Sequence, residues 1–339
     1  MRERAVDALA YWATGPGRGE LRPCRLPPPG KDDVLVRTLF SGVSRGTEAL
    51  VAAGRVPPSQ HQVMRAPFQE GSFPFPVKYG YSSVGRVTAG ADDLLGRLVF
   101  CLHPHQTAYV VPRAAVMPLP PGLPPERAVL AANMETALNA LWDAAPRAGE
   151  RIHVIGAGVV GCLVARLCRQ IPGAEVTLAD ILPERADVAV ALDVAFAPPD
   201  RLAGDADLVL HASGQGEGLR TALAVAGREG RIVELSWYGT AEVALPLGEA
   251  FHSRRLTIAS SQVGQVAPAM RPRWSHARRL AKALELLCDP ALDALLTGEV
   301  AFGSLPELMP RLLAPGGHAL CHRIVYPGSE QPEGEPSHA

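Results

Sequence analysis

The fold of this chain is decided by the stretch Arg151-Ile152-His153-Val154-Ile155-Gly156-Ala157-Gly158-Val159-Val160-Gly161. A short apolar strand runs directly into Gly-x-Gly-x-x-Gly, and the apolar residues that follow continue as a helix. Gly156 permits a tight turn, Gly158 lets the backbone approach a pyrophosphate, and Gly161 lets the helix pack closely on the strand. The phosphates would face the free N–H groups of the helix N-terminus. The pattern therefore predicts a dinucleotide site that also includes Ala157, Val159 and Val160.

An acidic residue completes this pattern. The next predicted strand, residues 175–179, leads into Asp180, about 20 residues after Gly161, where a carboxylate binds the ribose 2′-hydroxyl. Because a carboxylate there repels a 2′-phosphate, we expect NAD(H) to be preferred over NADP(H). The alternative is NADP(H), since Arg185 follows closely enough to reach round to a 2′-phosphate.

The composition is that of a soluble globular protein. With 339 residues, 47% hydrophobic and 20% charged, the chain is long enough for two domains. A net charge of -1 with no sustained basic run argues against nucleic acid or an anionic membrane surface as the main partner. No signal peptide and no membrane span is predicted, so we expect a cytoplasmic protein. The six cysteines include no C-x-x-C pair, so neither a disulfide framework nor a zinc knuckle is indicated.

A Pro-dense segment, residues 116–125, separates two regimes of sequence. Before it, short β-type runs punctuated by Gly and Pro suggest a small barrel, and after it apolar helical patterns alternate with β-branched strands. We expect a β-rich domain over residues 1–124, to which residues 297–327 return. A dinucleotide-binding domain should cover residues 125–296, and residues 328–339 should form a disordered tail.

The second half has the βαβ rhythm of a parallel, doubly wound sheet. The carboxyl ends of such strands line the ligand crevice, which makes Ser213, just beyond one strand end, a predicted cofactor contact. A last strand, residues 256–260, would form an open edge, and a helix from about 275 to 288 closes the unit. The other predicted strands are residues 152–155, 175–179, 207–211 and 231–236.

The order of these parts resembles the medium-chain dehydrogenase/reductase superfamily, the zinc-type alcohol dehydrogenases and their relatives. The resemblance implies a GroES-like β-rich catalytic domain and a Rossmann domain. Two segments support it. Residues 40–48, Phe-Ser-Gly-Val-Ser-Arg-Gly-Thr-Glu, resemble the loop with the first catalytic-zinc ligand, and residues 77–85, Val-Lys-Tyr-Gly-Tyr-Ser-Ser-Val-Gly, resemble the P-x-x-x-G-H-E-x-x-G segment. The first of them most resembles the branch of bacteriochlorophyllide hydroxyethyl dehydrogenases, which oxidise a secondary alcohol.

The zinc ligands of that superfamily are replaced here. Where it places Cys and then His-Glu, this chain has Ser44 and then Tyr81-Ser82, and hydroxyl and phenol groups are poor ligands for Zn²⁺. The four-cysteine structural-zinc loop is missing too. We therefore expect no zinc and no other metal. One alternative stays open, because Cys101, His103 and His105 alternate and would share one face of an extended strand.

Without zinc, side chains must supply the proton relay and stabilise developing oxygen charge. The segments that line the cleft in the resembled family offer Tyr81, Ser44 and Glu48. His103 and His105 have the ordinary pKa, near 6.5, of an acid–base group.

Three further candidates follow from the same resemblance. Arg45 is expected to contact the cofactor pyrophosphate. Glu135 and Thr136 open a helix that approaches the nicotinamide, although a carboxylate in a first helical turn is also favoured by the helix dipole.

We therefore expect an NAD(H)-dependent oxidoreductase that interconverts a secondary alcohol and a ketone of a mid-sized biosynthetic intermediate without catalytic zinc. Two alternatives remain: an NAD(P)H-dependent quinone or enoyl reductase, and a catalytically silent nucleotide-binding relative. Because the strand over 256–260 would leave an unpaired sheet edge, we also expect a homodimer formed through that edge.

Overall fold

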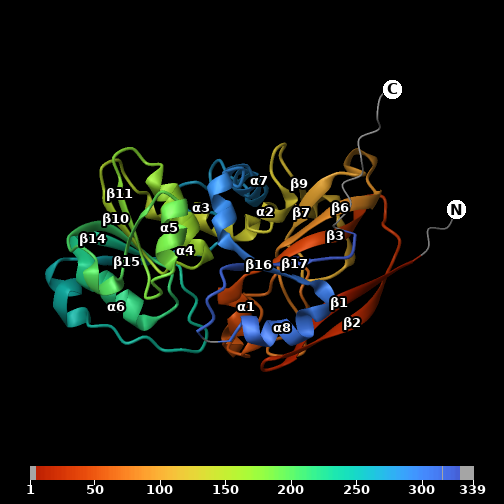
Figure 1. Ribbon diagram of the computed structural model, residues 1–339, viewed down its shortest axis with the longest axis horizontal. Helices are drawn as coiled ribbons and strands as arrows, with labels where there is room; N and C mark the ends of the chain where they lie inside the picture. The colour runs from red at the N-terminus through yellow and green to blue at the C-terminus, as the bar shows by residue number, and fades with distance from the viewer. Residues whose placement is uncertain (1–4, 315, 329–339) are drawn as a thin grey trace.

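The structure is a computed structural model, and it describes residues 5–314 and 316–328. Two lobes lie side by side, one built on a parallel sheet flanked by helices and one made largely of antiparallel strands (Figure 1). The predicted fold class, a Rossmann unit joined to a GroES-like β-rich domain, is confirmed. The expected disordered tail lies almost entirely outside the described residues.

The parallel lobe contains a six-stranded sheet in the order β12-β11-β10-β13-β14-β15. Its central strands β10 and β13 are almost wholly buried, which is why they read as largely apolar runs. The strand order reverses direction between β10 and β13, and a crevice for a ligand is expected at such a reversal. The strands are β10 (Arg151–Ile155), β11 (Glu175–Ala179), β12 (Ala195–Ala197), β13 (Ala206–His211), β14 (Ala226–Glu234) and β15 (Thr257–Ser260).

Helices cover both faces of this sheet. In α4, the small residues Gly161 and Cys162 let the helix lie close to β10, and α4 packs in turn against α3. The helices of the lobe are α3 (Ala131–Ala144), α4 (Val159–Arg169), α5 (Arg185–Ala191), α6 (Gly216–Val225) and α7 (His276–Leu286). The five strands and the closing helix predicted from sequence are all present, with ends that differ by a few residues.

The β-rich lobe contains two sheets. One has four strands in the order β2-β1-β5-β4, and the other has seven strands, with β16-β17-β3-β6-β7-β9 in a row and β8 paired to β3. The strands are β1 (Val6–Gly15), β2 (Arg18–Leu26), β3 (Asp33–Val43), β4 (Glu70–Gly71), β5 (Val77–Lys78), β6 (Ser83–Gly90), β7 (Leu98–Cys101), β8 (Ala108–Pro112), β9 (Val116–Pro118), β16 (Leu296–Ala301) and β17 (Cys321–Val325).

The end of the chain returns to this second sheet. Strand β17 pairs antiparallel with β3 and parallel with β16, so sequence segments far apart are joined in one ladder (Figure 1). Three helices border the lobe: α1 (Arg45–Ala52), α2 (Pro125–Ala128) and α8 (Leu305–Leu312). The domain limits themselves stay a prediction.

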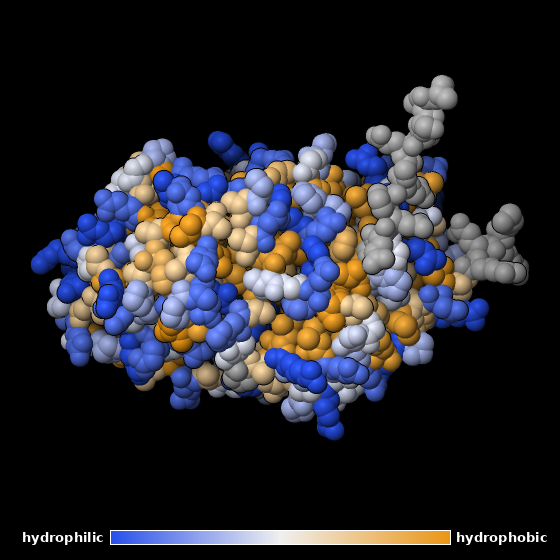
Figure 2. Space-filling view, viewed as in Figure 1, coloured by the Kyte–Doolittle hydropathy of each residue, from blue (hydrophilic) through white to orange (hydrophobic). Residues whose placement is uncertain are grey.

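The surface is mixed in character. Figure 2 shows apolar residues gathered toward the middle of the visible face and hydrophilic residues spread around its outer margin. Among the described residues, no helix combines the length and the apolar character needed to cross a membrane.

Candidate active site

The glycine-rich turn after β10 has the close contacts that its sequence predicts. Gly156 has a φ of 104°, and a Cβ there would lie 2.6 Å from the Ser213 backbone. A Cβ on Gly161 would lie 1.9 Å from the Gly156 carbonyl oxygen, so only glycine allows α4 to begin so near the strand. Beside Gly158, nothing lies within 4 Å of an added Cβ, which leaves the backbone open on that side. These three positions fit a pyrophosphate resting on the N-terminus of α4.

Asp180 lies at the end of β11, next to this turn. Its Oδ2 accepts a hydrogen bond from the Ala157 N–H at 2.7 Å, and its Oδ1 accepts one from the Leu182 N–H at 3.0 Å. A carboxylate has about four lone-pair positions, so each oxygen keeps capacity for one ribose hydroxyl. The side chain is therefore held in place by the glycine-rich turn and by the chain that follows β11.

Arg45 and Arg185 lie close together where the two lobes meet. Burial, and then the charge of Arg185, lower the pKa of Arg45 from its usual value. Arg45 donates to the Leu312 and Ala314 carbonyls, and Arg185 donates through Nη2 to the His318 carbonyl at 2.6 Å. The Nε of Arg185 is buried, and in the described part of the chain it has no acceptor. Two neighbouring cations without a carboxylate between them fit an anionic ligand such as a cofactor phosphate.

Tyr81 and Ser44 come together at the positions that correspond to zinc ligands. The Tyr81 hydroxyl lies near the side chains of Ser44 and Thr47, which partly offset the rise of its pKa, and the Ser44 hydroxyl accepts a hydrogen bond from Asn133 at 3.4 Å. Ser82 does not join them, because its hydroxyl donates to the Val129 carbonyl. A site of two hydroxyls and a phenol does not fit Zn²⁺.

Burial, and then the nearby charge of Glu48, raise the pKa of Tyr81 to about 12. The phenol therefore keeps its proton at neutral pH. It is suited to donating a hydrogen bond to a substrate oxygen rather than to removing a proton from it.

Behind Tyr81 lies a buried polar chain centred on Glu48. Its Oε2 is 3.1 Å from His105 Nε2, and its Oε1 accepts a hydrogen bond from the Ser44 N–H at 2.7 Å. Nδ1 of His105 is 2.8 Å from the hydroxyl of Ser41, which is 2.9 Å from the hydroxyl of Tyr326. Glu48 is 4% exposed and His105 is fully buried, so this carboxylate and imidazole satisfy one another.

His103 has different surroundings from His105. Its ring stacks on Tyr109, with ring centres 3.8 Å apart, and on Phe68 on the other side. Burial lowers the pKa of His103 to about 3, since its hydrogen bond to the Pro104 carbonyl only partly offsets the loss of water. The ring is therefore neutral and packed at ordinary pH, and the acid–base role of His103 stays a prediction.

The three alternating residues Cys101, His103 and His105 do not share a face. Strand β7 ends at Cys101, and the irregular chain beyond it turns the two histidines toward different partners. Within the described residues, no group of three or more His, Cys, Asp or Glu side chains is arranged to hold a metal. The interpretation of these residues as one face of a strand is thus wrong, because Pro104 follows the strand end.

Glu135 forms a buried ion pair with Arg279 of helix α7. Its Oε1 is 3.0 Å from Nε of Arg279 in α7, and both side chains are buried. Arg279 also donates to Asn139 at 2.6 Å, so this pair fastens α7 to α3. Thr136 donates to the Ala132 carbonyl within the same helix. Their predicted contacts with cofactor or substrate stay predictions.

The loop after β14 brings the carboxyl edge of the parallel sheet to Tyr81. Trp237 and Tyr81 both pack against an apolar cluster that includes Val51 and Phe73. An added Cβ on Gly239 would lie 2.5 Å from the Arg55 carbonyl oxygen, so this loop contacts the β-rich lobe directly.

Sequence reasoning did not single out Ser41, Tyr326, Asn133, His211 or Glu234. The first three lie on separate elements and have no shared sequence spacing. His211 and Glu234 did carry a signal, because a polar residue that ends a buried parallel strand faces the ligand crevice.

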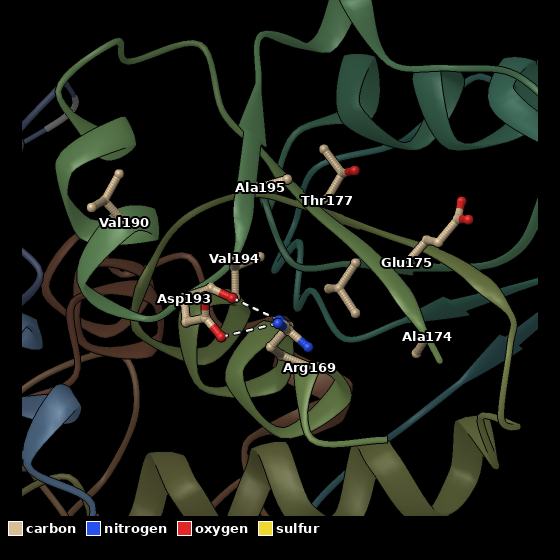
Figure 3. A pocket seen from close by; sticks show the side chains of 9 residues that line it. Arg169, Ala174, Glu175, Thr177, Val190, Asp193, Val194 and Ala195 are labelled. Carbon is tan, nitrogen blue, oxygen red and sulfur yellow. Dashed lines mark hydrogen bonds and ion pairs between the residues drawn. The ribbon is translucent and has the colours of Figure 1, made fainter. Parts of the chain in front are cut away.

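A further hollow lies elsewhere on the molecule. It has a volume of 560 Å³ and lies along β11 and β12, where Arg169 forms an ion pair with Asp193 (Figure 3). It is far from Tyr81 in the fold, so we assign it no part in the site.

Comparison with solved structures defines the class of fold: the chain has the two-lobed fold of alcohol dehydrogenases. No protein-family model matches it. One similar structure is a protein from Sinorhizobium meliloti 1021, described as a zinc-binding dehydrogenase and bound to NADP. It is 18% identical with a TM-score of 0.75, over 94% of this chain and 99% of that one.

Two Escherichia coli proteins are similar to the same degree. The L-idonate 5-dehydrogenase of strain K-12 is 15% identical with a TM-score of 0.76, over 95% of this chain and 99% of that chain. An enzyme of strain CFT073, named a short chain alcohol dehydrogenase and complexed with NADH, is 15% identical with a TM-score of 0.75, over 94% and 99%. At these identities the similarity establishes the shared fold.

Proposed function

We propose that this protein is an NAD(H)-dependent oxidoreductase that interconverts a secondary alcohol and a ketone of a mid-sized biosynthetic intermediate without catalytic zinc. The observation that supports the proposal is that each lobe contributes one part of the site, a nucleotide-binding turn and a phenol. An open glycine-rich turn with Asp180 beside it lies on one lobe. The phenol of Tyr81, beside Ser44 and Thr47, lies on the other lobe. Trp237, from the parallel lobe, packs against the same apolar cluster as Tyr81.

Each group has a stated task in this proposal. The glycine turn, Arg45 and Arg185 bind the cofactor phosphates, and Asp180 binds the adenosine ribose. The bound cofactor would supply hydride chemistry. Ser213 would contact the cofactor from the end of β13.

Tyr81 donates its hydrogen bond to the carbonyl oxygen of the ketone and stabilises the charge that develops there. Ser44 and Thr47 orient the phenol. Glu48, which is paired with His105, lies behind them. A cavity of 20 Å³ borders Glu48, enough for one water molecule that could exchange a proton.

We further propose that the protein works as a cytoplasmic homodimer. Strand β15 supports this, because it lies at the edge of the parallel sheet and pairs only with β14 among the described strands. Such an edge carries unpaired N–H and C=O groups that a second copy can satisfy.

The test is a screen of purified protein with NADH against ketones and conjugated enones. Turnover is measured as the decrease in NADH absorbance. We expect ketone reduction and its reversal with NAD⁺ and the alcohol. Tyr81→Phe should lower kcat about a hundredfold, as expected when one donor to an oxyanion is removed. Tyr109→Phe is the matched control, because it removes a buried hydroxyl that bonds Ser83 in the same lobe. Reduction of the C=C bond of enones alone would favour the enoyl or quinone reductase, and tight NADH binding without turnover would favour a silent relative.

A further inference from the structure

Three side chains at the carboxyl edge of the parallel sheet form a hydrogen-bonded cluster separate from Tyr81. The Ser213 hydroxyl is 2.6 Å from His211 Nε2, and His211 Nδ1 is 2.7 Å from Oε2 of Glu234. His211 and Ser213 come from the end of β13, and Glu234 ends the neighbouring β14. The imidazole thus joins a hydroxyl on one nitrogen to a carboxylate on the other, which is the arrangement of a Ser-His-acid triad.

The surroundings hold Glu234 as the charged member. Its Oε2 accepts hydrogen bonds from His211 and from the Tyr238 hydroxyl at 3.0 Å, and its Oε1 accepts one from the Ser236 N–H at 2.7 Å. Burial alone would raise the pKa of Glu234, but the hydrogen bonds from His211 and from Ser236 bring it below its usual value. A charged carboxylate on Nδ1 places the ring proton there and leaves Nε2 as the acceptor.

The hydroxyl of Ser213 is oriented by its other contact. Its oxygen accepts a hydrogen bond from the Gln215 N–H at 3.2 Å, and of the two acceptors for its own proton, His211 Nε2 at 2.6 Å is much nearer than the Gln215 carbonyl at 3.5 Å. The fully buried His211 cannot turn away, whereas Ser213 is only partly buried. A base is therefore fixed against a hydroxyl that solvent reaches.

The turn that carries Ser213 leads directly into α6, and the first turn of that helix lies against the hydroxyl. A Cβ on Gly218 would lie 2.4 Å from Ser213 Oγ and 2.5 Å from His211 Nε2, so only a glycine lets the helix lie this close to the pair. The first N–H groups of a helix have no partner within it. In the proposal below, these groups are the candidates to stabilise the charge on an attacked carbonyl oxygen.

We propose that Ser213, His211 and Glu234 form an acyl-transfer site that hydrolyses small carboxylic esters, a second activity separate from hydride transfer. Ser213 Oγ attacks the ester carbonyl while His211 Nε2 takes the hydroxyl proton. Collapse of the intermediate breaks the bond to the alcohol, which leaves with the proton from His211, and an acyl-serine remains. Water, deprotonated by His211, then hydrolyses that ester, releases the acid and restores Ser213. Ser213 is also the proposed cofactor contact, so bound cofactor and ester would compete for it. The reaction itself uses neither Tyr81 nor the cofactor, so its failure would leave the proposed dehydrogenase untouched.

The first test is labelling of the whole folded protein with a fluorophosphonate probe, with the modified peptide found by mass spectrometry. We expect one label on Ser213 and hydrolysis of p-nitrophenyl acetate by the same protein. Ser213→Ala should abolish both. The control Ser253→Ala removes an exposed hydroxyl that bonds the Glu249 carbonyl, away from the triad, and should retain both.

The second test asks whether the histidine acts as a base. His211→Asn should slow labelling about a hundredfold or more, the contribution expected of a positioned general base. Glu234→Gln keeps the size of the side chain but loses its charge, and should slow labelling by at least about tenfold while circular dichroism shows a folded protein. Absence of label on Ser213 in the unmodified protein, or equal labelling rates in folded Glu234→Gln, would overturn the proposal.

Discussion

Replacement of His103 by Phe should remove a specific loss of stability at acid pH. The ring of His103 is sandwiched between Phe68 and Tyr109 and is 4% exposed, so protonation in the folded protein is strongly disfavoured. Its pKa falls from 6.5 to about 3 on folding. The unfolded chain therefore binds a proton at mildly acid pH that the folded protein does not bind.

The sign and size of the effect follow from this difference. The contribution of His103 to the free energy of unfolding is constant above pH 6.5. It is lost as pH falls from 6.5 toward 3, because only the unfolded state gains the proton. One pKa unit corresponds to about 1.4 kcal/mol. At about pH 5 the free energy of unfolding should thus be about 2 kcal/mol lower than at neutral pH on account of His103 alone.

The assay is urea unfolding of the unmodified protein and of His103→Phe at pH 7 and at pH 5. Phenylalanine keeps an aromatic ring in the stack, and any constant cost of losing the bond to Pro104 cancels when each protein is compared with itself. Contributions from other titrating groups are common to both proteins. The variant should therefore lose about 2 kcal/mol less than the unmodified protein between the two pH values.

Equal pH dependence in the two proteins would refute this reasoning. It would mean that His103 is readily protonated in the folded state, and would bring back the acid–base role expected from sequence.

Four further predictions concern cofactor, metal, assembly and packing. NADH should bind more tightly than NADPH in isothermal titration, and Asp180→Ser should narrow the difference; equal affinities for the unmodified protein would count against a ribose contact by Asp180. Metal analysis should find no stoichiometric zinc, and chelators should leave activity unchanged; one zinc per chain would contradict the assignment of Ser44 and Tyr81. Light scattering should report a dimer of the 35.9 kDa chain that Ile258→Pro weakens by removing a ladder donor, whereas a monomer at micromolar concentration would end the edge-pairing proposal. Arg279→Met should cost about 3–5 kcal/mol in urea unfolding by leaving Glu135 buried without its partner, and Glu135→Gln in that background should restore part of it; a loss below about 1 kcal/mol would show that the carboxyl is already neutral.

The sequence by itself determined the parallel half of the molecule. Its central strands β10 and β13 are largely apolar. A side chain would collide at Gly156 and Gly161, and at Gly158 it would fill the open space beside the turn. The position of Asp180 follows from the same local unit, since it is fixed by its distance along the chain from the turn. Local constraints of this kind are visible in a single segment.

Only the tertiary structure decided the partners of the polar side chains. His103 and His105 are two positions apart, yet one is stacked between aromatic rings and the other faces Glu48, because β7 ends before them. Likewise, Glu135 reaches Arg279 in a distant helix, and Glu234 reaches His211 on a neighbouring strand. Burial and hydrogen bonding between residues far apart in sequence set the charge and the role of each group, and no spacing along the chain encodes those contacts.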